Sequence, residues 1–211
     1  MEFDDLRRAY RAGSLSKAEL TADPIELFRE WLQHAVDARE LEPNAMALST
    51  VGADGRPSVR FVLLKHVTAE GITFFTNYQS RKAGELDASH VAAAAFWWPQ
   101  LERQVRIEGT VERVPRRVSE EYFRSRPYGS QLGAWISPQS QRLADRDELE
   151  ALAAEMRGRF PEGAVPCPPH WGGYLLRPER VEFWQGREDR LHDRFLYSLE
   201  GGAWSVGRLA P

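Results

Sequence analysis

The chain has 211 residues, enough for a substantial core, and one domain is the simplest expectation. Its formal net charge of −3 excludes a general attraction to nucleic acid or anionic membranes, so an anion would need a local site. The single cysteine, Cys167, excludes an internal disulfide framework and a cysteine-rich zinc site, and it favours a reducing, cytoplasmic compartment.

The amino-terminal third predicts a helix after an unstructured start. Charged residues stand between Met1 and Tyr10, where an export signal would need an apolar run. Asp23-Pro24 is typical of a helix start, with an acidic N-cap and proline at the first helical position. Apolar residues then recur at helical spacing from Leu27 to Val36, which predicts a helix with one face against the core.

From Ala45 the period changes to that of strands. The runs 45–51 and 58–65 flank a glycine-containing turn, which predicts a hairpin. Further strands are expected at 71–77, 91–98 and 103–114, with a short helix over 80–87. The longest apolar run, 91–98, is far shorter than the roughly 20 residues that span a bilayer. The middle of the chain is therefore predicted to be a sheet of a soluble protein.

The second half mixes both kinds of element. Ser119 and Asp145, each followed by acidic residues, predict two helix starts, and the second helix should run to about Phe160. Strands are expected at 173–176, 180–184, 194–199 and 204–209. Because strands and helices do not alternate regularly, a doubly wound sheet is disfavoured. The expected fold is mainly β with flanking helices (α+β), built on a closed or partly closed antiparallel barrel.

Basic and hydroxyl residues gather at the predicted strand ends. Arg60 and Lys65 bracket an apolar run, and Ser80-Arg81-Lys82 follows the strand that ends near Asn77. Guanidinium and ammonium groups suit a phosphomonoester, and a helix start at Ser80 would add free backbone N–H groups. Taken alone, Ser80-Arg81-Lys82 fits a solvated basic turn better than a site.

A second group has a spacing of four and four residues: Tyr122, Arg126 and Ser130. If a helix continued to Arg126, its guanidinium and the Tyr122 hydroxyl would share a face and could hold one anion. Pro127 interrupts that pattern, and an ordinary exposed pair fits the spacing equally well.

A third group alternates within a hairpin-like unit: Arg190, His192 and Arg194. Alternation would place the three side chains on one face. Cationic groups so close repel one another unless an anion or an electron-rich ring lies between them, which favours a ligand.

Motifs for several other chemistries are missing from the sequence. It contains no glycine-rich dinucleotide fingerprint, no phosphate-binding loop ending in Gly-Lys-Ser/Thr, and no Gly-x-Ser-x-Gly elbow. His34, His66, His90 and His170 are scattered without paired ligand spacing, so no metal site is expected. A cofactor bound by strands and turns remains.

From about Asp23 onward the sequence resembles the pyridoxamine 5′-phosphate oxidase family. The matching segments follow the family order and are 60–65, 76–82, 101–105, 122–135, 139–140, 171–173, 182–195 and 208–211. Each is weak alone, but together they are specific. The resemblance implies an FMN-binding split β-barrel formed by residues 23–211. It also implies a homodimer in which each active site draws on both subunits.

The same resemblance implies roles for individual residues. Flavin contacts are expected from Arg60, Phe61, Val62, Leu63, Leu64, Lys65, Phe75, Thr76, Arg81, Lys82, Gln104, Gln139, Ser140, Trp184 and Arg194. Substrate contacts are expected from Arg7, Tyr10, Lys65, Tyr122, Arg126, Ser130, Arg190 and His192. Arg194 and His192 would be catalytic. Phe75 stands where the family usually has tyrosine, which leaves that position a packing or backbone contact. Residues 1–22 would form a mobile segment in which Arg7 and Tyr10 close over the substrate, although Ala9 replaces an acidic residue often found there.

The implied activity is the FMN-dependent oxidation of pyridoxamine 5′-phosphate and pyridoxine 5′-phosphate to pyridoxal 5′-phosphate. A hydride would pass from C4′ to flavin N5, and dioxygen would leave as hydrogen peroxide. No strong general base is evident. Two alternatives stay open: a flavin or deazaflavin-dependent reductase on the same fold, and a non-catalytic flavin or pyridoxal-phosphate binding protein. The Tyr122, Arg126 and Ser130 group favours the oxidase, because it would hold a substrate phosphate.

Overall fold

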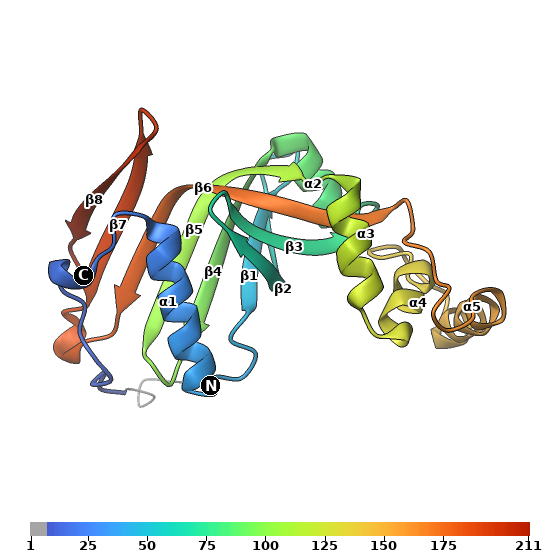
Figure 1. Ribbon diagram of the computed structural model, residues 1–211, viewed down its shortest axis with the longest axis horizontal. Coiled ribbons are helices and arrows are strands. Elements are labelled where there is room, and N and C mark those ends of the chain that lie inside the picture. The colour runs from blue at the N-terminus through green and yellow to red at the C-terminus, as the bar shows by residue number, and fades with distance from the viewer. Residues whose placement is uncertain (1–7) are drawn as a thin grey trace.

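The computed structural model describes residues 8–211, which fold around a sheet of eight strands (Figure 1). The strands are β1 (Ala45–Val51), β2 (Pro57–Thr68), β3 (Gly71–Asn77), β4 (Val91–Trp98), β5 (Arg103–Arg113), β6 (Trp171–Gln185), β7 (Asp193–Glu200) and β8 (Ala203–Leu209). Their order is β3-β2-β1-β4-β5-β6-β7-β8, and β3 also pairs with β6. That extra pairing closes the first six strands into an antiparallel barrel. The predicted mainly β barrel with flanking helices is confirmed.

The helices lie around this barrel. They are η1 (Lys17–Glu19), α1 (Pro24–Asp37), α2 (Arg81–Ser89), α3 (Arg116–Ser125), α4 (Tyr128–Ile136), α5 (Arg146–Arg159) and η2 (Glu188–Arg190). The helix α1 begins as predicted, because the Asp23 carboxylate accepts a hydrogen bond from the Ile25 N–H at 2.8 Å. None of the helices in the described part of the chain has the length and apolar character needed to cross a membrane.

Two elements in the second half of the chain differ from prediction. The strands expected at 173–176 and 180–184 are one continuous strand, β6. Pro178 does not end it, because the β5–β6 register shifts between Glu108 and Gly109 and the shift absorbs the proline. Gly109 is required there, since a Cβ atom would lie 1.9 Å from the Arg177 carbonyl oxygen. The helix expected to start at Ser119 begins earlier, at Arg116.

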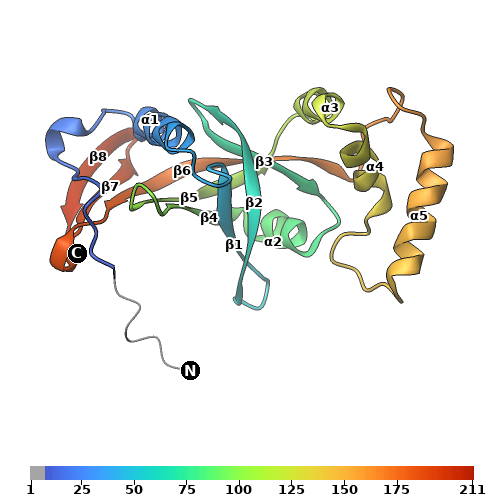
Figure 2. The same ribbon diagram turned by 90° about the horizontal axis from the view of Figure 1, so that it is seen from below.

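The core has two parts at different places along the molecule. The first fills the barrel and packs under α1, where Phe28 and Trp31 meet Phe96 and Phe183. The second joins α3, α4 and α5 to the start of β6. Figures 1 and 2 show that these three helices and the β7–β8 hairpin lie at opposite ends of the long axis, with β6 running between them. Side chains at the two ends of β6 therefore belong to different surroundings.

Candidate functional site

A cavity of about 620 Å³ lies among β2, β3 and the helices α2, α3 and α4. Its volume falls in the range of roughly 300–1,000 Å³ typical of small-molecule sites. The predicted site residues that line it are Arg60, Phe61, Val62, Leu63, Lys65, Phe75, Thr76, Lys82, Tyr122, Arg126, Ser130 and Gln139. The fold thus brings together most of the first two sequence groups. It adds residues that the sequence analysis did not assign, among them Asn77, Ser137 and Trp171.

One end of the cavity is basic and hydrogen-bonded. The Lys82 ammonium donates to Gln139 Oε1 at 2.7 Å and to Thr76 Oγ1 at 3.0 Å. Burial, helped by the nearby Arg60 guanidinium, lowers the pKa of Lys82 to about 8. A lysine held in this state gains much from an anion, because an anion offsets the cost of keeping its charge buried. This end can bind a phosphate.

A buried carboxylate stands behind that basic end. Glu85 accepts hydrogen bonds from Thr50, Ser58, Arg60 and Arg81. Burial acts to raise the pKa of Glu85, but these hydrogen bonds outweigh it and lower the pKa to about 2. Sequence reasoning missed Glu85, although its place four residues after Arg81 was a signal for an ion pair on one helix face. Arg81 itself contacts Glu85 and is not part of the cavity lining.

The other end of the cavity is an aromatic wall. Phe75 stacks on Tyr122 with ring centroids 4.1 Å apart, and on Trp171 at 5.4 Å. His66 meets the edges of Phe75 and Tyr122. Phe75 therefore packs against both of these rings. The wall offers flat apolar surface next to polar groups, a combination that suits a ring carrying a charged substituent.

Arg126 lies across this wall with an unused donor. Its guanidinium carbon is 4.7 Å from the centroid of Trp171 and 5.7 Å from that of Phe123. Burial lowers its pKa. Its Nη1 atom is buried, and none of the described residues supplies it with a hydrogen-bond acceptor. An unsatisfied buried N–H group is costly, so this atom marks a place where a ligand oxygen fits.

The helix that contains Tyr122 does not continue to Arg126, and the interruption at Pro127 is where it stops. The helix α3 ends at Ser125, Arg126 is extended, and a separate helix, α4, begins after Pro127. The proline forces this break because the residue before it avoids the helical region. Arg126, Tyr122 and Ser130 still face one cavity, because the corner between the two helices turns them toward it.

A second set of predicted residues lies at the far end of β6, which we call the Trp184 row. Cross-strand pairing aligns Trp97 with Gln104, Gln104 with Trp184, and Trp184 with Arg194. Paired residues point to the same face of a sheet, so the register brings these side chains together. The guanidinium of Arg194 is held in place by Glu182 at 2.8 Å and by the Ala210 carbonyl at 2.8 Å.

Tyr10 and His192 complete the surroundings of the Trp184 row. The ring centroid of His192 is 4.5 Å from that of Trp184, and Tyr10 lies 5.7 Å from both rings. The His192 Nδ1 atom accepts a hydrogen bond from the Arg187 N–H, so the neutral ring carries its proton on Nε2. Burial and the charges of Arg190 and Arg194 lower the pKa of His192, which favours this neutral form.

The shared strand face expected for Arg190, His192 and Arg194 is wrong. Only Arg194 lies in a strand, whereas Arg190 ends the short helix η2 with a positive φ and His192 lies between the two. The three residues therefore share no strand face, although the charges of Arg190 and Arg194 still act on His192. Arg7 lies outside the described residues.

The first residues that the structure describes are docked rather than extended away. The Glu102 carboxylate accepts hydrogen bonds from Arg8 and from the Ala12 N–H, and Asp193 accepts one from the Leu15 N–H. These contacts bring Tyr10 to the Trp184 row. Mobility of the 1–22 segment stays a prediction.

Two further predicted flavin contacts do not line the cavity. The side chain of Leu64 is buried in the barrel core, so only its backbone could meet a ligand. Ser140 follows Gln139 with a φ of 73° and is not among the lining residues.

The cavity and the Trp184 row are far apart within one chain. Trp171 lines the cavity at the start of β6, and Trp184 lies near its end. At about 3.3 Å per residue, roughly 40 Å of strand separates them. The cavity and the Trp184 row of one chain therefore cannot both contact the same small ligand.

An apolar surface covers the outer face of the barrel beside the cavity. Val59, Phe61 and Leu63 alternate on β2, and Phe61 is 78 % exposed. On the neighbouring strand β1, Phe61 pairs with Ala47 and Leu63 pairs with Ala45. Because the two alanine side chains are small, they leave the Phe61 ring exposed above the sheet. An exposed patch of this kind is typical of a protein interface.

The sequence matches two family models. Residues 32–160 match the model described as pyridoxamine 5′-phosphate oxidase. Residues 171–211 match the pyridoxine 5′-phosphate oxidase C-terminal dimerisation region. The second match covers β6, β7 and β8, which carry Trp184, His192 and Arg194.

Curated relatives match over nearly the whole chain. A pyridoxine/pyridoxamine 5′-phosphate oxidase of Ectopseudomonas mendocina is 56 % identical over 98 % of this chain and 97 % of its own. One from a Cyanothece species is 50 % identical over 100 % of this chain and 99 % of its own. Among solved structures, PhzG from Burkholderia lata, in complex with tetrahydrophenazine-1-carboxylic acid, has a TM-score of 0.88 and 33 % identity, covering 93 % of this chain and 98 % of its own. An FMN-binding protein of Nostoc punctiforme shares the fold, with a TM-score of 0.72 and 19 % identity. The match covers 94 % of this chain and 100 % of that one.

Proposed function

The chain belongs to the pyridoxamine 5′-phosphate oxidase family, and from this premise we propose that it oxidises pyridoxine 5′-phosphate and pyridoxamine 5′-phosphate to pyridoxal 5′-phosphate with FMN as cofactor. In the proposed reaction the alcohol and dioxygen give the aldehyde and hydrogen peroxide. The amine additionally consumes water and releases ammonia. The names of relatives at 50–56 % identity support this substrate class over that of PhzG at 33 %.

The cavity offers donors for the phosphates of both proposed ligands. Lys82 and Arg60 provide a basic end for the FMN phosphate, with Gln139 and Thr76 beside them. Arg126 provides a buried N–H at the aromatic wall for the vitamin phosphate, and no residue in the described part of the chain accepts from it. When bound, FMN supplies the hydride acceptor. The protein holds each ligand by its charged end and so orients the two rings.

We propose that the working unit is a homodimer. The dimerisation-region match, the exposed Phe61 face and the distance between the cavity and the Trp184 row support this assembly. In such a dimer the cavity of one chain meets the Trp184 row of a second copy. Each active site would then contain Lys82 and Arg126 from one chain and His192 and Arg194 from the other.

His192 and Arg194 have distinct roles in this proposal. The proton of the neutral His192 ring is on Nε2, so the ring can donate a hydrogen bond to the substrate but cannot accept a proton at that atom. Arg194 is oriented by Glu182 and the Ala210 carbonyl, which directs a fixed charge toward the bound rings. Orientation and a fixed electrostatic environment are therefore the contributions expected of these residues.

The observation that carries the proposal is the buried Nη1 of Arg126 beside the aromatic wall, which has no hydrogen-bond partner among residues 8–211. The test is an oxidase assay on pyridoxine 5′-phosphate with and without added FMN, which follows both peroxide and pyridoxal 5′-phosphate. Equal amounts of the two products, dependent on FMN and absent with unphosphorylated pyridoxine at the same concentration, would support it. Flavin binding without turnover would indicate a carrier, and turnover only with a reduced nicotinamide would indicate a reductase.

A further inference from the structure

Glu85 is a buried carboxylate next to a site that would bind anions. A negative charge there would repel the ligand, so its presence calls for an explanation. We propose that Glu85 is a positioning residue that fixes the guanidinium groups of Arg60 and Arg81 for the 5′-phosphate of FMN. This inference rests on the proposed function, because it assumes that FMN occupies the basic end of the cavity. Glu85 itself is not among the cavity-lining residues, so it would act through Arg60, which lines the cavity, and through Arg81, which does not line it but precedes the lining residue Lys82.

The hydrogen bonds around Arg60 connect its guanidinium to Glu85 through two hydroxyl groups. Arg60 Nη1 donates to Thr50 Oγ1 at 2.6 Å, and Nη2 donates to Ser58 Oγ at 2.5 Å. A guanidinium can only donate, so both hydroxyl groups accept from it. Each hydroxyl has one proton, which it donates to Glu85 Oε2. The distance from Ser58 Oγ to Glu85 Oε2 is 2.7 Å. Arg60 also reaches Glu85 directly at 3.2 Å.

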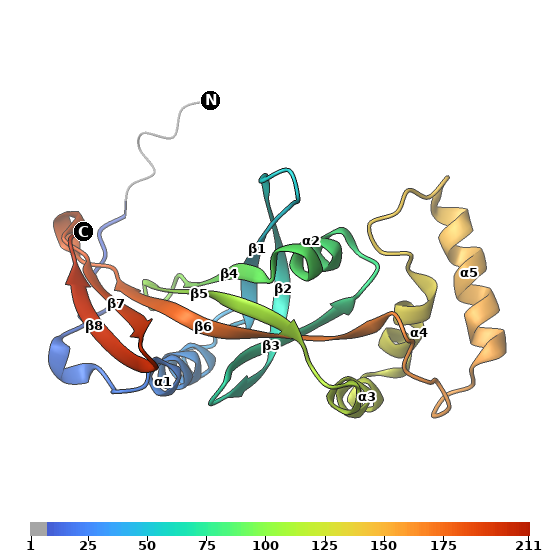
Figure 3. The ribbon, with the colours of Figure 1, turned by 90° about the horizontal axis from the view of Figure 1, so that it is seen from above.

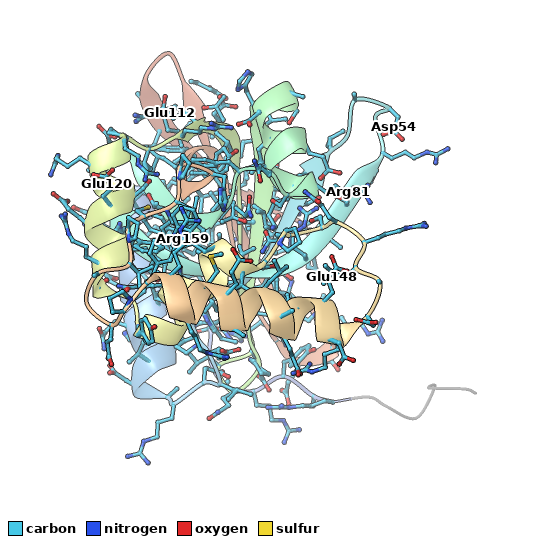
Figure 4. All side chains as sticks on the ribbon, turned by 90° about the vertical axis from the view of Figure 1, so that its right-hand side faces the viewer. Asp54, Arg81, Glu112, Glu120, Glu148 and Arg159 are labelled. Carbon is cyan, nitrogen blue, oxygen red and sulfur yellow. The ribbon has the colours of Figure 1, made fainter. Side chains whose placement is uncertain are left out.

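The second carboxylate oxygen serves the other arginine. Glu85 Oε1 accepts from Arg81 Nε at 2.8 Å, within the first turns of α2. Figure 3 shows α2 beside the β1–β2 hairpin, which carries Thr50, Ser58 and Arg60. In Figure 4, Arg81 of α2 and Glu120 of α3 lie on opposite sides of the molecule. One carboxylate therefore ties a helix and two strands to a single arrangement of donors.

Charge counting supports the same role. Arg60, Arg81 and Lys82 carry three positive charges and Glu85 one negative charge, so the cluster carries 3 − 1 = +2. A phosphomonoester carries about −1.5 to −2 near neutral pH. Without Glu85, three cations would stand together before the ligand arrives, and their repulsion would spread them. With Glu85, the cluster matches its ligand and stays ordered in advance.

Two effects of Glu85 oppose each other, and the structure indicates which is larger. Its negative charge repels a phosphate, but that charge is already paired with two guanidinium groups and two hydroxyl groups. Replacing it by glutamine removes one acceptor oxygen and leaves an amide donor facing other donors. We therefore expect the loss of order to exceed the relief of repulsion.

The test compares Glu85→Gln with wild type by titrating apoprotein with FMN and, separately, with riboflavin, using quenching of flavin fluorescence. A role in positioning the phosphate donors should raise the Kd for FMN about tenfold or more and leave that for riboflavin, which has no phosphate, within twofold. The matched control is Asp87→Asn, which removes one negative charge from the same helix, where Asp87 contacts Arg113 and Tyr174 instead. That control should change neither Kd.

Each alternative result is decisive. Equal weakening of FMN and riboflavin would make Glu85 a merely structural residue and overturn the inference, as would unchanged or tighter FMN binding. Wild-type protein that binds neither flavin would overturn the proposed function and the inference together. If Glu85→Gln does not fold, Ser58→Ala removes one bridging hydroxyl and keeps the carboxylate. It should raise the FMN Kd about threefold without affecting riboflavin, and no change would overturn the inference.

Discussion

Replacing Arg126 by methionine should separate ligand binding from stability. Methionine keeps apolar contact with Trp171 and Phe123 but removes the buried Nη1 that no described residue satisfies. In the complex that atom would make a charge-assisted hydrogen bond to phosphate, worth about 1.5–3 kcal/mol. At 1.4 kcal/mol per tenfold, KM for pyridoxine 5′-phosphate should rise roughly 10- to 150-fold. In the free protein this change removes no side-chain hydrogen bond to residues 8–211, so the melting temperature should stay unchanged.

The assay for Arg126→Met is steady-state peroxide release over a range of pyridoxine 5′-phosphate concentrations, with thermal melting of the apoprotein. Arg124→Met is the matched control, because Arg124 is exposed on α3 and is not part of the cavity lining. It should leave KM unchanged. An unchanged KM for Arg126→Met, or a KM increase matched by a large fall in melting temperature, would refute the reasoning.

Three further outcomes follow from the fold and the site. First, the pKa of Lys82 is about 8 against an ordinary 10.5, so FMN affinity should fall as pH rises through 8. The unfolded chain binds more protons between those values, so apoprotein stability should instead rise there, and fluorescence titration and denaturant unfolding measure the two trends. Second, Phe61→Asp should give a monomer in analytical ultracentrifugation, whereas Val36→Asp, on the exposed side of α1, should not. Third, Gly109→Ala should destabilise the fold by at least about 2 kcal/mol in chemical denaturation, because its Cβ would collide with the Arg177 carbonyl.

Each of these has a clear contrary result. An FMN affinity that is flat from pH 7 to 9, or equally pH-dependent in Lys82→Met, would show that Lys82 does not hold the phosphate. A dimeric Phe61→Asp protein would place the interface elsewhere. A Gly109→Ala protein of wild-type stability would mean that β5 and β6 can separate at the register shift without cost.

Local patterns were enough to predict most of the barrel. The strands at 71–77 and 91–98 occur with the predicted bounds, because their β-branched and apolar residues are bounded by clear turn signals. Pro178 misled the prediction, since only the partner strand reveals the register shift that accommodates it. The helix α4 was missed because Pro127 was taken only as an interruption, whereas it also precedes a new helix.

The site was harder to predict than the fold, for a reason that concerns distance in sequence. The residue types of Arg60, Lys82 and Arg126 suited an anion without deciding for one, and all three line the same cavity. The role of Glu85 depends on contacts with Thr50 and Ser58, which lie 35 and 27 residues away, and no local pattern encodes such contacts. Likewise, nothing within one chain's sequence shows that His192 lies at the far end of β6 from the cavity.

The strand β6 also bears on how the chain can be divided. The matched dimerisation region begins at Trp171, the first residue of β6, yet this strand pairs with both β3 and β5 and so completes the barrel. Cutting the chain there would leave two long, unpaired strand edges, which tend to recruit other chains into aggregates. The carboxyl-terminal segment thus contributes a strand that the barrel of the amino-terminal region needs for closure. It is not a separate module that could be grafted onto another protein.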